Sequence, residues 1–327
     1  MKNTEEKKVV AGVDVAKAEL VVRGSWDTSV RRFENTANGV KKLLKVLKEH
    51  GCSLVVCEHT GRHEQLLVST LFSKDMPVHC AHPKAIHHFA KARKATAKSD
   101  PIDAETIMLY GLTMELKPTQ PPSPGLRRLQ ELAGRRDDLR EMLIMEKNRL
   151  KAPGISSALK SDIRAVIKML ENRLQRNQQE IADLLKDEPS LAAPVQILCQ
   201  EYGVGLISAA LLYASMPELG TLTRQTAASL AGLAPILRDS GRYSGQRRIG
   251  GGRTLARNAL YMVAMAAIRK KGSILQTVYL RLKRAGKRNM VALTAVMRKL
   301  IIRLNTVLKV LHEPIIRNSP VGATSAQ

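Results

Sequence analysis

Four acidic residues in the first third of the chain have the types and spacing needed to bind divalent cations. Asp14 follows an apolar run in AGVDVAK and Glu58 follows another in LVVCEHTG, so both are expected where strands end. Asp100 and Asp103, in KSDPIDAET, are three residues apart at a helix start marked by Pro101, and this spacing places both on one helix face. If the two strands are neighbours and the helix packs across their ends, the four carboxylates converge.

Such a cluster predicts a magnesium or manganese site. Carboxylates at short range need cations between them, and ligands that are all oxygen select Mg²⁺ or Mn²⁺. Two such ions about 3.5–4 Å apart can clamp the attacking and leaving oxygens of a phosphodiester. Each residue also has a structural alternative, because Asp14 or Glu58 could cap a strand end and Asp100 could be a helix N-cap.

These positions depend on an α/β arrangement in residues 1–115. Short β-branched runs predict strands, and apolar residues at 3, 4 and 7 spacing predict helices. The expected strands are 8–15, 19–23, 30–35, 54–57 and 78–81, and the expected helices are 38–50, 64–73, one from residue 83 and one from about residue 101. Three strands followed by strand–helix alternation predict a mixed sheet covered by helices.

The rest of the chain is expected to be helical. The proline-rich segment LKPTQPPSP, at 116–124, predicts an extended linker. Narrow apolar stripes in a charged background over 125–190 predict a helical hairpin or coiled coil, which could meet a partner or simply connect two parts. Residues 191–327 form the expected basic helical domain, where the Gly203-Val204-Gly205 turn could seat a phosphate or be a plain tight turn.

The charge of the chain points to a polyanionic partner. Among 327 residues, 53 Lys and Arg against 29 Asp and Glu give a net charge of +24, and from Arg238 to Leu311 the only acidic residue is Asp239. Nucleic acid carries enough phosphate to neutralise such a surface. Aromatic residues make up only 3%, which argues against an extended stacking platform for single strands and favours duplex or structured nucleic acid.

A membrane or secreted location is not expected. The polar start MKNTEEKKVV does not resemble a signal peptide, and no apolar run approaches the ~18–20 residues of a membrane span. The four cysteines lack C-x-x-C pairs, so they are expected to be reduced thiols. We therefore expect a cytoplasmic protein.

The order of these elements and acidic motifs resembles the ribonuclease H-like fold in its Holliday-junction-resolvase (RuvC-type) form. More closely, the chain is similar to the DEDD transposases of bacterial insertion sequences, which include pilin-gene invertases and RNA-guided bridge recombinases. The likeness also covers AHPKAI at 81–86, EKNRL at 146–150, YGVGLISAALL at 202–212, AGLAPILRDSG at 231–241 and LARNALYM at 255–262. The resemblance implies that Asp14, Glu58, Asp100 and Asp103 bind the metal.

The resemblance also implies a second chemical centre in LRDSGRYSG. The nucleophilic serine of the family matches Ser240, with Ser244 as the nearby competitor and a turn role as the structural alternative. A serine–phosphodiester bond would conserve the energy of the broken linkage, so strands could be rejoined without ATP; the chain accordingly has no G-x-x-x-x-G-K-[ST] loop. The candidate nucleic-acid contacts around it are Arg238, Arg242, Arg247, Arg248 and Arg253.

The function expected from these features is that of a DNA transposase or site-specific recombinase. Its partners would be donor and target duplexes and, as the resemblance implies, a structured guide RNA. Strand exchange needs several active centres, so a dimer assembling to a tetramer is expected, with carboxylates and serine shared between protomers. The alternatives are a DNA invertase, a metal-dependent junction or flap nuclease without a covalent intermediate, and a non-catalytic DNA-binding protein.

Overall fold

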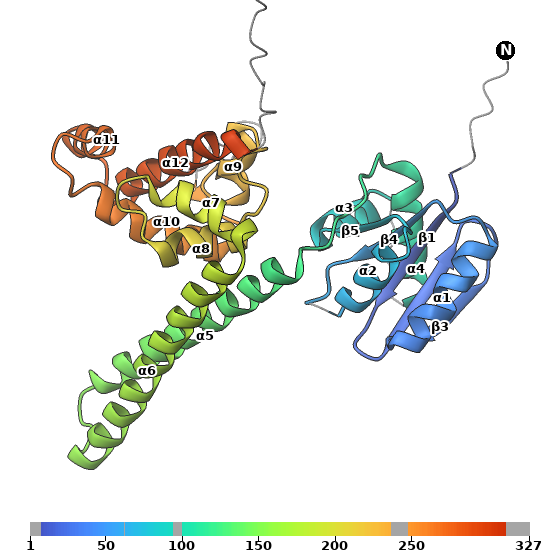
Figure 1. Cartoon of the computed structure of the whole chain (residues 1–327), viewed down its shortest axis with the longest axis horizontal. Coiled ribbons are helices and arrows are strands. Elements are labelled where there is room, and N and C mark those ends of the chain that lie inside the picture. Colours follow the sequence, from blue (N-terminus) through green and yellow to red (C-terminus); the bar gives the residue numbers. More distant parts are fainter. Residues whose placement is uncertain (1–7, 62, 94–99, 237–247, 312–327) are drawn as a thin grey trace, which may run out of the picture. The chain divides into compact units, whose positions relative to one another are not determined.

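The computed structural model describes residues 8–61, 63–93, 100–236 and 248–311. The chain divides into two units, Met1–Pro121 and Pro122–Gln327 (Figure 1). In chain order, the first unit contains β1 (Val10–Val15), β2 (Glu19–Gly24), β3 (Val30–Glu34), α1 (Ala37–Glu49), β4 (Leu54–Glu58), α2 (Gln65–Phe72), β5 (Val78–Ala81), α3 (Pro83–Ala92) and α4 (Asp100–Thr113).

The first unit is built on a five-stranded mixed sheet with the strand order β3-β2-β1-β4-β5. β1 and β3 pair antiparallel with β2, whereas β4 pairs parallel with both β1 and β5. The central position of β1 and β4 explains their sequences, because strands buried on both faces need continuous apolar runs. The register pairs Val13 of β1 with Cys57 of β4, so Asp14 and Glu58 come one residue later on neighbouring strands.

Helices cover both faces of this sheet. On one face, Val13 and Cys57 pack with residues of α1 and α2 such as Leu43 and Leu67. On the other face, Val10 and Val56 pack with Ile107 and Met108 of α4. Because strand side chains alternate between faces, Asp14 and Glu58 belong to the face that α4 covers.

Local sequence signals set the ends of the helices. The Thr36 hydroxyl accepts a hydrogen bond from the Gly39 backbone N–H at the start of α1, and Gly51 adopts a φ of 61° just after its end. Pro83 lies in the first turn of α3. Such capping residues satisfy or remove backbone groups that have no partner inside the helix.

Gly12 allows α4 to lie against the backbone of β1. A Cβ atom at position 12 would collide with the carbonyl oxygen of Ala104 and the backbone nitrogen of Met108. Gly111 lies on α4, about one helical turn after Met108. A Cβ at Gly111 would lie 2.7 Å from side-chain atoms of Val10 and Val56. The absence of side chains at these two positions therefore determines how closely the helix approaches the strands.

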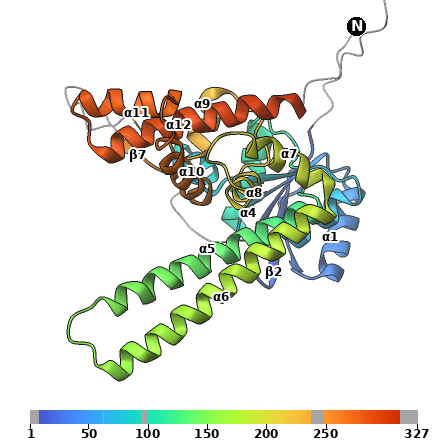
Figure 2. The same ribbon diagram turned by 60° about the vertical axis from the view of Figure 1, so that its left-hand side comes forward.

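The second unit is mainly helical. Its elements are α5 (Pro124–Leu150), α6 (Ser157–Asp187), α7 (Pro189–Cys199), α8 (Leu206–Ser215), α9 (Arg224–Leu230), β6 (Pro235–Ile236), β7 (Arg248–Ile249), α10 (Thr254–Ala267), α11 (Ile274–Arg284), α12 (Asn289–Val307) and the 3₁₀ helix η1 (Leu308–Leu311). Helices α5 and α6 run side by side as a long hairpin (Figure 2). Leu129 and Ile181, near the base of this hairpin, share one hydrophobic core with Leu260 and Leu300 of the basic helices.

These observations confirm the expected fold class, a ribonuclease H-like α/β unit followed by a mainly helical one. The short antiparallel pair of β6 and β7 was not expected, because two-residue strands leave no periodic pattern. The finer division into a linker at 116–124, a coiled coil at 125–190 and a basic domain at 191–327 stays a prediction. No helix within the described part of the chain is both long and apolar enough to cross a bilayer.

The contact at Gly12 predicts a large effect of one methyl group. Gly12→Ala should destabilise the first unit by about 1–3 kcal/mol, because neither backbone can move away without repacking the core. Trp26, the single tryptophan of the chain, lies between β2 and β3 and stacks edge-on with His50, so its fluorescence reports unfolding of this unit. Urea unfolding followed at Trp26 measures the change.

The matched control is Gly205→Ala, because a Cβ at Gly205 meets no atom within 4 Å and its φ of −82° suits any residue. This control should leave the Trp26 transition unchanged. Equal midpoints for Gly12→Ala and the wild type would refute the close-contact explanation.

Candidate active site

Asp14 and Glu58 lie at the carboxyl ends of the two central parallel strands. Asp14 is the fifth residue of β1 and Glu58 is the last residue of β4. Both follow the register pair Val13–Cys57 and belong to the face covered by α4. Both are partly exposed, so polar groups of a ligand can reach them.

Helix α4 brings the third carboxylate to the same place. Asp103 directly precedes Ala104, the residue whose carbonyl meets Gly12 of β1, so the first turn of the helix lies near the ends of the strands. Asp103 is partly exposed. Asp100 begins the same helix, but its side chain lies outside the described residues.

The electrostatics of Glu58 show that three of these carboxylates lie close together. Burial raises the pKa of Glu58 above its ordinary value, and the charges of Asp14 and Asp103 raise it further. A like charge disfavours ionisation only at short range. Asp14 and Asp103 therefore lie within electrostatic range of Glu58. The role of these carboxylates as metal ligands stays a prediction.

The chemistry of these groups fits a hard divalent cation, since every side chain is a carboxylate. Asp14, Glu58 and Asp103 would hold such an ion, joined by Asp100 if its side chain turns the same way. Within the described residues, no three His, Cys, Asp or Glu side chains form a group close enough to enclose a metal. The donors are therefore of the right type without forming a closed cage.

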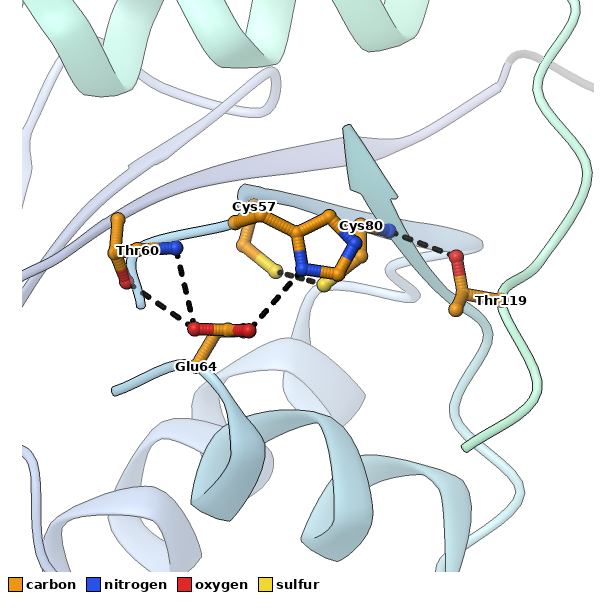
Figure 3. Close-up of polar contacts among 6 residues, drawn as sticks. Cys57, Thr60, Glu64, Cys80 and Thr119 are labelled. Carbon is orange, nitrogen blue, oxygen red and sulfur yellow. Dashed lines mark hydrogen bonds and ion pairs between the residues drawn. The ribbon is translucent and has the colours of Figure 1, made fainter. Parts of the chain in front are cut away.

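A buried carboxylate that the sequence analysis missed is Glu64, just before α2. Glu64 accepts hydrogen bonds from the Thr60 backbone N–H at 3.2 Å and the Thr60 hydroxyl at 3.4 Å, and it contacts His59 Nδ1 at 3.1 Å (Figure 3). Burial acts to raise the pKa of Glu64, but hydrogen bonds from its own backbone, His59 and Thr60 outweigh burial and lower it. Glu64 thus fixes the loop that follows Glu58.

The signal for this residue was present in the sequence, because Glu64 directly precedes the apolar run of α2 in EHTGRHEQLL. Its burial, which distinguishes it from a surface acid, could not be read from that position. Beside it, the Cys57 and Cys80 sulfurs are 3.4 Å apart on adjacent strands (Figure 3), and both thiols are free. The Cys80 contact and burial raise the pKa of Cys57, so this thiol stays protonated.

The predicted second centre lies mostly outside the described residues. Ser240, its competitor Ser244, and the arginines at 238, 242 and 247 all fall in the segment 237–247. Strands β6 and β7 flank this segment and pair with each other, Pro235 with Ile249 and Ile236 with Arg248. The ends of the segment carrying Ser240 are therefore held together.

Two glycines allow the chain on either side of β6 and β7 to approach closely. Gly232 and Gly252 have φ values of 67° and 64°, and a Cβ at Gly252 would collide with the backbone of Gly232. Arg248 is exposed on β7. Arg253 instead binds Glu218 at 2.6 Å and donates to the Ser215 carbonyl at 2.8 Å, so its charge is already partly neutralised.

The chain is similar to known proteins along most of its length. A family model for the DEDD transposase of IS110 matches residues 11–153, and one for the transposase IS116/IS110/IS902 family matches residues 195–280. Pilin gene-inverting proteins of Moraxella bovis and Moraxella lacunata are each 26% identical over 312 residues, covering 90% of this chain and 94% of theirs. A solved structure of T. thermophilus RuvC in complex with Holliday junction substrate aligns with 16% identity and a TM-score of 0.28, covering 34% of this chain and 99% of that chain.

The first matched region contains all four predicted carboxylates and the second contains Ser240. Together they cover more than two thirds of the chain. The fold, the acidic cluster and these matches define an enzyme of DNA recombination. The chain belongs to the IS110/IS116/IS902 family of DEDD transposases.

Repulsion at the acidic cluster should make the unit less stable at neutral pH. Because the pKa of Glu58 is raised on folding from an ordinary value of 4.5, the folded protein holds this proton more tightly than the unfolded chain. Stability is therefore lost as the pH rises above about 4.5. In EDTA, Glu58→Gln should have a higher urea midpoint than the wild type at pH 7 and a similar one at pH 4, measured at Trp26.

The control variant is Glu105→Gln on α4, where the carboxylate is half exposed and faces Arg23 at 4.0 Å. It should show no gain at pH 7. A wild type that is more stable than Glu58→Gln at pH 7 in EDTA would mean that the carboxylates do not repel one another.

Proposed function

We propose that this transposase cuts and rejoins DNA by magnesium-dependent phosphoryl transfer through a covalent serine–DNA intermediate. The observation that carries the metal-dependent part is the placement of Asp14 and Glu58 one residue past a register pair of adjacent parallel strands, on the face covered by α4. Burial, and then the charges of Asp14 and Asp103, raise the pKa of Glu58. Carboxylates at such range favour a bound cation. The serine part is supported by the position of Ser240 inside the second family match.

The residues divide the reaction between them. Asp14, Glu58, Asp100 and Asp103 would hold Mg²⁺, or Mn²⁺ in its place. When bound, such an ion supplies Lewis-acid stabilisation of phosphoryl oxygens and lowers the pKa of a coordinated hydroxyl. Ser240 Oγ attacks the phosphorus, so that a Ser–O–P bond forms, the P–O bond to the next nucleotide breaks and the leaving oxygen takes up the serine proton. Attack by another strand end on this ester rejoins DNA without ATP.

The active centre is proposed to be composite. The carboxylates belong to the first unit and Ser240 to the second, and strand exchange between two duplexes needs several such centres at once. A dimer that assembles into a tetramer would let the carboxylates of one protomer act with the serine of another. The reaction would take place in the cytoplasm of a bacterium or archaeon.

The nucleic-acid partners follow from charge and from the family. Donor and target DNA duplexes would lie against the basic second unit, whose Arg238, Arg242, Arg247 and Arg248 are close to Ser240 in the sequence. A structured guide RNA would select the two sites. Arg253, whose charge faces Glu218, would support the base of the segment as well as any phosphate nearby.

Site-specific inversion is a second candidate outcome of the same chemistry. Both curated relatives are described as pilin gene-inverting proteins, and they match along 90% of this chain. Inversion and insertion differ in the arrangement of the two sites and share the cutting step. A plasmid carrying two sites in inverted orientation distinguishes them, because inversion reverses the intervening segment and insertion does not.

A covalent adduct is the most specific consequence of the proposed mechanism. Labelled DNA from the end of the element, incubated with the protein and Mg²⁺, should yield a protein–DNA adduct on a denaturing gel. Ser240→Ala should abolish the adduct, with at least about a 10³-fold loss of strand transfer as expected when a nucleophile is removed.

Ser244→Ala is the matched control and should retain the adduct, since only one of the two hydroxyls is the nucleophile. RNase treatment before the reaction should abolish it if a guide RNA selects the site. Free nicked ends from both serine variants, with no adduct from the wild type, would identify a metal-dependent nuclease instead.

Arg247 and Arg248 should determine much of the salt dependence of DNA binding. Replacing both Arg247 and Arg248 with Ala should lower affinity for unrelated duplexes and flatten the slope of log K against log salt by about 0.9 per lost phosphate contact. Fluorescence anisotropy at several salt concentrations measures this slope. Arg253→Ala, at the residue paired with Glu218, should change the slope less; an unchanged slope in the double variant would reject the phosphate role.

A further inference from the structure

A pocket of about 310 Å³ opens on the second unit. It lies where the turn before α8 meets the end of α10, the start of α11 and one side of α12. Its lining combines an aromatic ring, an apolar side chain and several charges: Glu201, Tyr202, Lys270, Lys271, Ile274 and Arg303. The volume is at the lower end of the ~300–1,000 Å³ typical of small-ligand sites, which suits one nucleotide and excludes a duplex.

The backbone turn at Gly203 holds Tyr202 close to the end of α10. Gly203 has a φ of 85°, and a Cβ there would lie 3.2–3.3 Å from atoms of Val263, Ala266 and Ala267. The turn therefore rests directly on the last turn of α10. Lys270, which follows that helix, has its Nζ 4.6 Å from the centre of the Tyr202 ring.

The ring nevertheless stays available to a ligand. Tyr202 is 52% exposed and Ile274, on the opposite element, is 63% exposed. Exposed aromatic and apolar side chains that line one pocket offer a surface on which a ligand can pack. A planar nucleic-acid base could pack against both side chains at once.

The charge of the pocket selects an anion. Glu201, the only acidic residue in its lining, is bound by Arg303 Nε at 2.7 Å and is thereby neutralised. Lys270 and Lys271 have no ion pair with any residue that the structure describes. The chain has no Asp or Glu from residue 240 to 311 that could supply one from the neighbouring helices.

We propose that this pocket binds one unpaired nucleotide of a nucleic acid, with its base against Tyr202 and Ile274 and its phosphate beside Lys270 and Lys271. A base inside a duplex cannot offer its face, whereas an extruded or single-stranded base can. The site would thus recognise a nucleotide released when DNA strands separate, or one in a loop of RNA. The few aromatic residues of the chain are compatible with this, because one ring serves one base.

Photocrosslinking of the full-length protein tests the proposal. The probes are an oligothymidylate and an oligouridylate that each carry one 5-iodouracil, and the same DNA strand annealed into a duplex. Irradiation should join the single-stranded probes to Tyr202, located by mass spectrometry, and the duplex should give no such adduct. The stronger of the DNA and RNA arms identifies the source of the nucleotide.

Affinity measurements supply an independent readout that does not require strand cutting. Tyr202→Ala should weaken single-strand binding about 10-fold, the range expected for one stacked base, with duplex affinity unchanged. Tyr202→Phe should bind as the wild type does. Tyr261→Ala, at a 36% exposed tyrosine of α10 outside the pocket, should have no effect on either affinity. Lys309→Ala removes an exposed positive charge of η1 outside the pocket and should weaken binding of the single-stranded and duplex probes equally.

Three outcomes would overturn the proposal. These are an adduct on Tyr202 from the duplex as strong as from single strands, equal losses for both probes in Tyr202→Ala, and displacement of the oligonucleotides by AMP at equal concentration. The last result would show that the site serves a free nucleotide. Because binding is measured without cleavage, each outcome is separate from the fate of Ser240.

Discussion

The approach of α4 to β1 at Gly12 is the constraint on which the carboxylate cluster depends. Asp14 and Glu58 are fixed by strand pairing alone, since they follow a register pair of adjacent parallel strands. The helix can bring Asp103 to them only because no side chain separates Ala104 from Gly12. A bulkier residue at position 12 would push the helix outward and move the third acid from the first two. One missing methyl group thus links core packing to the electrostatics of Glu58.

Much of this arrangement can be predicted from sequence because its signals are local. Apolar runs that end in Asp14 and Glu58 mark buried strands, and Pro101 between two acids marks a helix start. The roles of Gly12 and Glu64 cannot be predicted in this way. In the sequence, nothing distinguishes Gly12 from any other small residue of the strand, because its contact with α4 is visible only in the structure. Glu64 likewise looks like a surface acid, because its burial and its bonds to the loop are visible only in the structure. Both depend on contacts between distant parts of the chain.

In the second unit, the sequence reveals how many charges there are and the structure reveals which of them are paired. Its excess of Lys and Arg is visible in the sequence and indicates a polyanion. The distribution of those charges requires the structure: Arg253 and Arg303 are held by Glu218 and Glu201, whereas Lys270 stands over an exposed ring. A uniformly basic sequence therefore contains cations of different kinds, some that support the fold and some that are free for phosphate. The pocket at Tyr202 contains both kinds, since Arg303 is paired with Glu201 and Lys270 and Lys271 have no ion pair within the described part of the chain.

The central claim is that acids from β1, β4 and α4 bind divalent ions together. Anomalous diffraction from crystals grown with Mn²⁺ tests it most directly, because the scattering locates the metal without reference to activity. The account predicts a manganese peak coordinated by carboxylate oxygens of Asp14, Glu58 and the acids of α4, at about the 2.0–2.2 Å usual for such ions. A fully occupied peak elsewhere, with the Glu58 carboxylate turned away from Asp14, would contradict it.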